Sequence, residues 1–167
     1  MPAQDDKLRV LVVDDNVDAA ATFCALLRLS GCEAQAASGL AIALAVAASF
    51  EPDVVVLDLE MPGADGCRVL QQMRERGDGL ADPLYVCLTG ASSDENRRRC
   101  EAAGFHRFHA KPLRPHELAE ILADARARRL RQRVAMAMPE AAPLPAPGAA
   151  ISQGVRAGPA GNDPLSH

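Results

Sequence analysis

The fold of this chain is decided by one stretch, DVVVLDLEMPGADG, at residues 53 to 66. Val54 to Leu57 are four consecutive apolar residues, which is typical of a strand buried on both faces of a parallel sheet. Asp58 follows at once, so we expect a carboxylate at the carboxyl end of that strand. Residues 61 to 66 contain a proline and two glycines, and glycine admits the positive φ values that tight turns need. The stretch therefore predicts a buried strand, an acid and a turn.

Similar patterns extend outward from this stretch in both directions. Apolar runs at 8 to 13 and 84 to 88 indicate two more buried strands, and weaker strands are expected at 33 to 36 and 105 to 110. Helical patterns lie between them, at 17 to 29, 40 to 48, 67 to 76 and 94 to 103, and after Pro115. Five strands alternating with five helices predict a doubly wound α/β fold, a parallel sheet covered on both faces. The helix at 94 to 103 is mostly polar, so we expect it to be the loosest.

Length and composition place this fold in one domain with a tail. The chain has 167 residues, which is enough for one well-buried core but not for two. We expect an N-terminal extension at 1 to 7, a domain at 8 to 134, and a tail at 135 to 167. The tail is rich in Pro, Ala and Gly without periodicity, so we expect it to be disordered and to hold no output domain.

Charge and hydropathy exclude several function classes. Apolar residues make up 49% of the chain, charged residues 24%, and the formal net charge is -4. That balance offers no broad basic field, so we expect neither direct nucleic-acid binding nor membrane binding. The N-terminus lacks the pattern of a secretory signal, and no apolar stretch is long enough to span a bilayer. We therefore expect a cytoplasmic protein.

Acidic residues follow two of the predicted strands. Asp14 and Asp15 come directly after the first strand, and Asp58 ends the third. Sites in open α/β sheets lie beyond the carboxyl ends of the strands, so these carboxylates should converge. Three converging carboxylates repel one another unless a cation lies among them, and oxygen ligands with room for water suit Mg²⁺. Alternatively, the acids after the first strand only cap the helix that follows, as Asp15 or Asn16 could do.

Two more strand ends carry polar groups of a different kind. Thr89 follows the fourth strand and Lys111 follows the fifth. A hydroxyl can donate to a phosphoryl oxygen, and an ammonium group is a compact charge suited to phosphate. Taken singly, Thr89 reads as a capping residue and Lys111 as a surface lysine. Together with the acids, at the ends of four strands, they indicate a site for phosphoryl transfer.

Four motifs carry a resemblance to a known family. They are VLVVDDN at 10 to 16, DVVVLDLEMPGADG at 53 to 66, LTG at 88 to 90 and FHAKP at 108 to 112. Over residues 8 to about 125 the chain resembles the receiver domain of two-component response regulators. The resemblance implies a flavodoxin-like (βα)5 fold with strand order 2-1-3-4-5. It also implies phosphorelay signalling by a stoichiometric acceptor that dephosphorylates itself, not by a turnover enzyme.

The same resemblance assigns chemical roles to the strand-end residues. Asp58 would accept the phosphoryl group from a histidine kinase or a histidine phosphotransfer protein. Asp15 would be the main Mg²⁺ ligand, Asp14 its companion through water, and Glu60 would offer its backbone carbonyl to the ion. Together with Mg²⁺, Lys111 would neutralise the charge of the phosphoryl group in transfer.

A switch is also implied, through Thr89 and Phe108. On phosphorylation Thr89 would move toward the phosphoryl oxygens and Phe108 would fill the vacated space. That would repack the face formed by the fourth helix, fifth strand and fifth helix, which controls protein partners. The chain departs from the family where Phe108 replaces a common tyrosine, and where His106 and His109 make the last strand unusually polar.

Several alternatives stay open at this level. The chain could be a free-standing receiver, which its first Met and coil-like end favour, the C-terminal receiver of a hybrid histidine kinase, or a module that signals by binding alone. An aspartate-nucleophile phosphatase is disfavoured because Glu60 stands where a second Asp is expected. A flavodoxin-like binder is disfavoured because Asp14 and Asp15 replace a phosphate cradle. The arginines at 126 to 133 are either a solvated helix end or a surface for an acidic partner.

Overall fold

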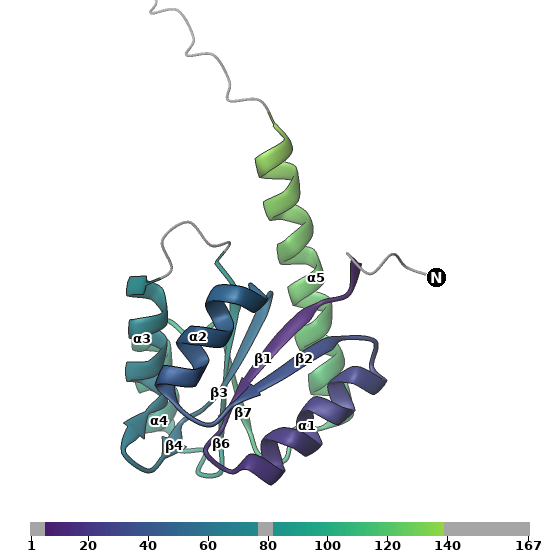
Figure 1. Ribbon diagram of the computed structural model, residues 1–167. Helices are drawn as coiled ribbons and strands as arrows, with labels where there is room; N and C mark the ends of the chain where they lie inside the picture. The colour runs from purple at the N-terminus through teal and green to yellow at the C-terminus, as the bar shows by residue number, and fades with distance from the viewer. Residues whose placement is uncertain (1–5, 77–81, 139–167) are drawn as a thin grey trace, which may run out of the picture.

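The main sheet consists of five parallel strands in a computed structural model that describes residues 6 to 76 and 82 to 138 (Figure 1). The strands are β1 (Arg9–Val13), β2 (Glu33–Ala37), β3 (Val54–Asp58), β6 (Leu84–Thr89) and β7 (Arg107–Ala110). Their order across the sheet is β2-β1-β3-β6-β7. Counted along the chain, this is the predicted order 2-1-3-4-5, so the predicted doubly wound fold is confirmed.

Five helices cover the two faces of this sheet. They are α1 (Val17–Leu29), α2 (Leu40–Phe50), α3 (Gly66–Arg76), α4 (Asp94–Ala103) and α5 (Pro115–Ala137). Helices α1 and α5 pack on one face, and α2, α3 and α4 pack on the other (Figure 1). Each helix follows its strand as the alternating sequence pattern predicted.

Alternation within each strand divides the core into two layers. In β3, Val54 and Val56 pack against α1 and α5, whereas Val55 and Leu57 pack against the other three helices. Successive side chains of a strand point to opposite faces, so a strand covered on both faces must be apolar throughout. This is the physical reason for the uninterrupted apolar run that precedes Asp58.

Local capping determines where two helices begin. Asn16 precedes α1, and its side-chain Oδ1 accepts a hydrogen bond from the Ala19 N–H at 3.1 Å. Ser93 does the same for α4, accepting from the Asn96 N–H at 3.1 Å. Both contacts satisfy a backbone donor that the first helical turn leaves without an intrahelical partner. Asn16, one of the two expected candidates, is therefore the cap of α1.

Three local features differ from the sequence expectation, the first being that α2 ends at Phe50 and not at residue 48. A short antiparallel hairpin of β4 (Glu60–Met61) and β5 (Ala64–Asp65) stands where only a turn was expected. The last strand begins at Arg107, two residues later than expected, because residues 104 and 105 form the C-terminal cap of α4. Gly104 ends that helix at φ 99°, and the Phe105 N–H still donates to the Cys100 carbonyl at 3.0 Å.

The C-terminal part of α5 projects well beyond the sheet (Figure 1). Among the described residues, every buried side chain lies between Leu8 and Ala125, although α5 continues to Ala137. In the part of the chain that is described, no helix combines the length and apolarity needed to cross a membrane. Of the tail expected at 135 to 167, residues 135 to 137 are the helical end of α5, and residues from 139 onward lie outside the described residues. The domain boundary at 134 stays a prediction.

Candidate phosphoryl-acceptor site

The acidic cluster lies where β1 and β3 end side by side. After β1 the chain forms β2 on one side of β1, and after β2 it crosses over to form β3 on the other side. Ligands of such sheets bind at this reversal of strand order, in the crevice at the carboxyl ends of β1 and β3. One ligand oxygen each from Asp14, Asp15 and Asp58 lie within 4.8 Å of one another. Asp14 and Asp58 are buried and Asp15 is exposed. The structure therefore brings together the three acids singled out from the sequence.

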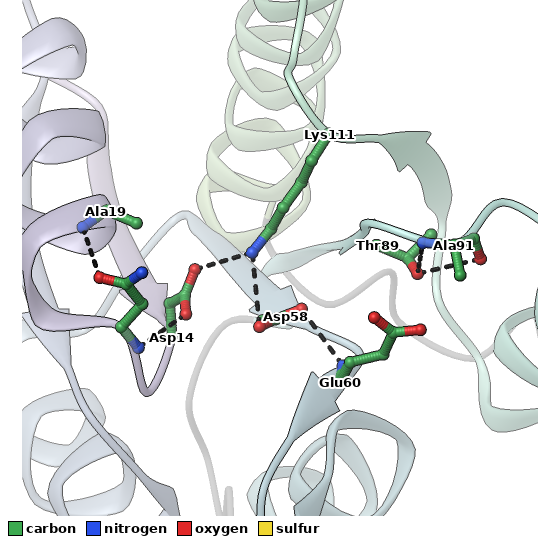
Figure 2. A network of polar contacts seen from close by, with 8 residues as sticks. Asp14, Ala19, Asp58, Glu60, Thr89, Ala91 and Lys111 are labelled. Carbon is green, nitrogen blue, oxygen red and sulfur yellow. Dashed lines mark hydrogen bonds and ion pairs between the residues drawn. The ribbon is translucent and has the colours of Figure 1, made fainter.

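Lys111 supplies the cation that faces this cluster. Its Nζ lies 2.9 Å from Asp14 Oδ2 and 3.4 Å from Asp58 Oδ2, so one ammonium group bridges both buried acids (Figure 2). The backbone holds it there, because the Lys111 N–H donates to the Thr89 carbonyl at 2.8 Å. Burial alone would lower the pKa of Lys111, but its hydrogen bond to Asp14 and the charge of Asp58 outweigh burial and raise that pKa.

Asp58 is held in a similarly balanced environment. Burial raises the pKa of its carboxyl group, and the nearby charge of Asp14 adds to that rise. Two contacts oppose the rise: the Glu60 N–H donates to Asp58 Oδ1 at 3.2 Å, and the Lys111 charge lies on the side of Oδ2 (Figure 2). Each carboxylate oxygen of Asp58 therefore has its own stabilising partner.

Gly66 allows the turn after Asp58 to fold back on itself. A Cβ atom at this position would lie 2.5 Å from the Asp58 carbonyl oxygen and 3.1 Å from the Leu59 Cα. Both neighbours are backbone atoms, so neither can rotate away. The glycine at the end of the fold-deciding stretch is thus required by close packing against the candidate acceptor.

Thr89 is fully buried at the end of β6, and its hydroxyl is engaged with Ala91. Thr89 Oγ1 donates to the Ala91 carbonyl and accepts from the Ala91 N–H, both at 3.1 Å. Figure 2 shows this hydroxyl turned toward Ala91, while Lys111 alone reaches between the acids. The structure therefore does not join Thr89 to the carboxylate network.

Phe108 lies on the same side of the sheet as Thr89. It pairs in register with Cys87, two residues before Thr89, and it packs against the core layer under α4. Its ring is half-buried, and the Arg97 guanidinium carbon lies 5.1 Å from the ring centroid. At that distance a cation is attracted to the face of an aromatic ring.

Three features of the site were missed from the sequence. The Asn16 N–H donates to Asp14 Oδ1 at 3.0 Å, and Arg97 of α4 covers Phe108. An open cavity of about 800 Å³ also reaches Asp58 and Lys111 along α1, where Phe23 and Leu113 are among its lining residues. The Asx-type spacing of Asp14 and Asn16 could have indicated the first. No local signal could indicate the other two, because they join segments distant in sequence.

Comparison with known proteins agrees with this geometry. A family model described as the response regulator receiver domain matches residues 10 to 123. The chain is 33% identical over 118 residues to the sensory/regulatory protein RpfC of Xanthomonas campestris pv. campestris, covering 70% of this chain and 16% of that protein. It is 39% identical over 120 residues to the transcriptional regulatory protein PrrA of Mycobacterium leprae, covering 71% of this chain and 48% of that protein. The chain thus spans less than half the length of these relatives.

A solved structure gives the same result in three dimensions. The chemotaxis protein CheY4 of Vibrio cholerae superposes with a TM-score of 0.63 at 26% sequence identity. The match covers 71% of this chain and 98% of that one. The similarity therefore spans nearly the whole of that chemotaxis protein.

Proposed function

The chain belongs to the response regulator receiver family of two-component signalling, and from this premise we propose that Asp58 accepts a phosphoryl group from a histidine kinase or a histidine phosphotransfer protein. The observation that carries the proposal is the position of Lys111 Nζ, 2.9 Å from Asp14 and 3.4 Å from Asp58. A fixed cation beside a partly desolvated carboxylate is suited to a reaction in which negative charge must be brought to negative charge.

The reaction is a displacement at phosphorus. A carboxylate oxygen of Asp58 bonds to phosphorus as the P–N bond of the donor phosphohistidine breaks, and the electron pair of that bond stays on the imidazole. Lys111 already contacts the Asp58 carboxylate, so its ammonium group can pair with a phosphoryl oxygen without a large movement. The Glu60 N–H holds Asp58 Oδ1 and limits rotation of the carboxylate. These contacts supply the orientation and charge balance on which such transfers depend.

The donor set of the site fits Mg²⁺. It offers carboxylate oxygens from two buried acids and one exposed acid, and this hard-oxygen set suits a cation that keeps several waters. Asp15, Asp14 and Asp58 would hold the ion, together with the backbone carbonyl of Glu60. When bound, Mg²⁺ would neutralise charge on the phosphoryl oxygens.

Phosphorylation then changes the protein through Thr89 and Phe108. The Thr89 hydroxyl must leave its two hydrogen bonds with Ala91 before it can donate to a phosphoryl oxygen. That movement frees space beside the core layer that Phe108 borders, and Arg97 links the Phe108 ring to α4. The α4-β7-α5 face is therefore the surface that we propose to control downstream protein partners. The chain acts as a stoichiometric acceptor that hydrolyses its own phosphate, in the cytoplasm.

The test is the intact mass of the chain after incubation with acetyl phosphate, with and without Mg²⁺. Wild type should gain one phosphate adduct that depends on Mg²⁺ and is labile to hydroxylamine, as an acyl phosphate is. Asp58→Ala should gain none. Asp18→Ala is the matched control, because Asp18 is an exposed acid in the first turn of α1 and should leave the adduct unchanged. An adduct on Asp58→Ala would refute the acceptor assignment, and a folded wild type without any adduct would indicate signalling by binding alone.

A further inference from the structure

The distal α5 segment, residues 126 to 138, lies beyond the buried core and is held to the domain by polar contacts. Arg128 pairs with the Asp82 carboxylate, and its Nε donates to the Asp82 carbonyl at 3.0 Å. Gln132 Nε2 donates to the same carbonyl at 2.9 Å, and Arg129 donates to the Lys7 carbonyl at 2.8 Å. These contacts decide which side of the distal segment faces the domain, and so which side faces away.

An apolar row occupies the side that faces away. Leu130 and Val134 are four residues apart and lie on one side of α5; Met138, the residue that caps the helix, follows four residues later and its N–H donates to the Val134 carbonyl at 3.1 Å. Their exposed fractions are 64%, 50% and 69%, in a segment that projects from the domain (Figure 1). We call these three residues the distal apolar row. A single exposed leucine is ordinary on a protein surface. A row of apolar side chains at helical spacing, however, matches the surface that one helix presents to another when they pack.

Positive charge borders this row. Arg126 precedes Leu130 by four residues and Arg131 precedes Val134 by three, so both lie alongside the row, and both are exposed. Arg133 borders the row as well and lies 3.8 Å from Asp6. The sequence from 126 to 138 contains no acidic residue. The surface is therefore apolar along its centre and cationic at its edges.

This charge pattern selects among the surfaces that could cover the row. A second copy of the chain would set arginines against arginines, with no acid in either segment to compensate. An anionic membrane is disfavoured because the whole chain carries a net charge of -4, and because a single row without aromatic residues buries little area in a bilayer. A helix with an apolar face and acidic edges complements both the row and its arginines.

We propose that the distal apolar row docks an amphipathic helix of a partner protein, one whose apolar face is flanked by Asp and Glu. This docking site is separate from the phosphoryl-transfer site and adds a second function to the one proposed above. Helix α5 begins near the carboxyl ends of the strands and runs past their amino ends (Figure 1). The row therefore lies at the end of the domain opposite Asp58. The docked helix packs against Leu130, Val134 and Met138, and its acids pair with Arg126 and Arg131.

The proposal is tested with a fluorescein-labelled designed helical peptide that has a leucine row flanked by glutamates. Its fluorescence anisotropy is measured while the full-length chain is added. Wild type should bind, and the double variant Leu130→Asn, Val134→Asn should weaken binding by about tenfold or more, which corresponds to about 1.4 kcal/mol. Arg126→Glu with Arg131→Glu should weaken binding as much, and added salt should weaken wild-type binding.

Met136→Asn is the matched control, because Met136 is 76% exposed and lies on the same segment but off the row. It should bind like wild type. All variants keep the buried core, and their labelling by acetyl phosphate should be unchanged, so failure here is distinguishable from failure of the Asp58 assignment. The proposal is overturned by equal binding of a lysine-flanked peptide, by binding of phosphatidylserine vesicles in place of the peptide, or by self-association of the chain in sedimentation.

Discussion

Among single residues, Lys111 compensates the negative charge of the two buried acids, Asp14 and Asp58. It is the cation within ion-pair distance of both buried acids, and its side chain is one-third exposed. Removing one member of a buried charged group leaves the others without compensation, which costs more than the net contribution of the pair when intact. The stability of the unphosphorylated site therefore depends on whether a cation is present, and not only on the acids.

Lys111→Ala tests this dependence. We expect the free energy of unfolding to fall by about 1 to 2 kcal/mol, less than for a fully buried pair because solvent screens part of the interaction. Added Mg²⁺ should recover part of the loss, since it would place a cation between the same carboxylates. Urea denaturation with and without MgCl₂ measures both effects, with Lys7→Ala as the control. A loss that Mg²⁺ does not change would contradict the expectation.

His106 gives the fold a dependence on pH. Its Nδ1 accepts the Tyr85 N–H at 2.9 Å, which requires the neutral ring, and partial desolvation together with the charge of Arg128 lowers its pKa from the ordinary 6.5. With the folded-state pKa below the unfolded one, the stabilisation is complete above 6.5 and is lost as the pH falls toward the folded value. The urea midpoint should therefore fall as the pH falls from about 7 to about 5.

His106→Asn should reduce that pH dependence, because the asparagine Oδ1 can accept the same N–H and does not titrate in this range. His116→Asn is the control, since His116 is exposed at the start of α5. Urea midpoints at several pH values measure the effect. Equal slopes for wild type and His106→Asn would show that other groups govern the dependence.

At the scale of elements, the turn into α3 governs the position of the acceptor. Gly66→Ala would place a methyl group 2.5 Å from the Asp58 carbonyl oxygen, so the backbone must shift. We expect a destabilisation of about 1 to 3 kcal/mol and slower labelling by acetyl phosphate. Gly39→Ala is the matched control, because it is extended at φ 178° and no atom lies within 4 Å of its Cβ position. Labelling of Gly66→Ala at the wild-type rate would mean that the turn does not position Asp58.

Of the five helices, α4 is the one most weakly anchored to the core. Only Cys100 is buried in it, whereas α1, α2, α3 and α5 each bury three or four residues. Little apolar burial opposes local opening, so we expect its amide hydrogens to exchange with solvent faster than those of the other four helices. Hydrogen exchange followed by mass spectrometry measures this. Protection of α4 equal to that of α3 would argue against a low-cost rearrangement of the α4-β7-α5 face.

For the whole molecule, the described core ends well before the chain does. All buried residues among those described precede 126, and the distal α5 segment is held by polar surface contacts. We therefore expect a chain cut after 138 to keep the urea midpoint of the full-length protein, and to gain the same phosphate adduct. A lower midpoint would show that residues 139 to 167 contribute to the stability of the fold, and the proposed boundary would have to move.

The amino-acid sequence alone determined the alternation of strands and helices, the two-sided burial of the three central strands β1, β3 and β6, and the polar residues at the ends of four strands. These features depend on local periodicity, which a run such as Val54 to Leu57 displays directly. The strand order followed from resemblance, and the structure confirms it. Boundaries were less accurate where a cap hydrogen bond holds residues beyond a helix end, as where the Phe105 N–H donates to the Cys100 carbonyl of α4.

Only the tertiary structure decided how the strand-end groups approach one another. It placed Lys111 between Asp14 and Asp58, turned the Thr89 hydroxyl to Ala91, and set Arg97 over Phe108. Such contacts join residues far apart in the chain or depend on one rotamer among several, so no local pattern encodes them. The outward direction of the distal apolar row was decided in the same way, because packing against Asp82 orients the helix that carries it.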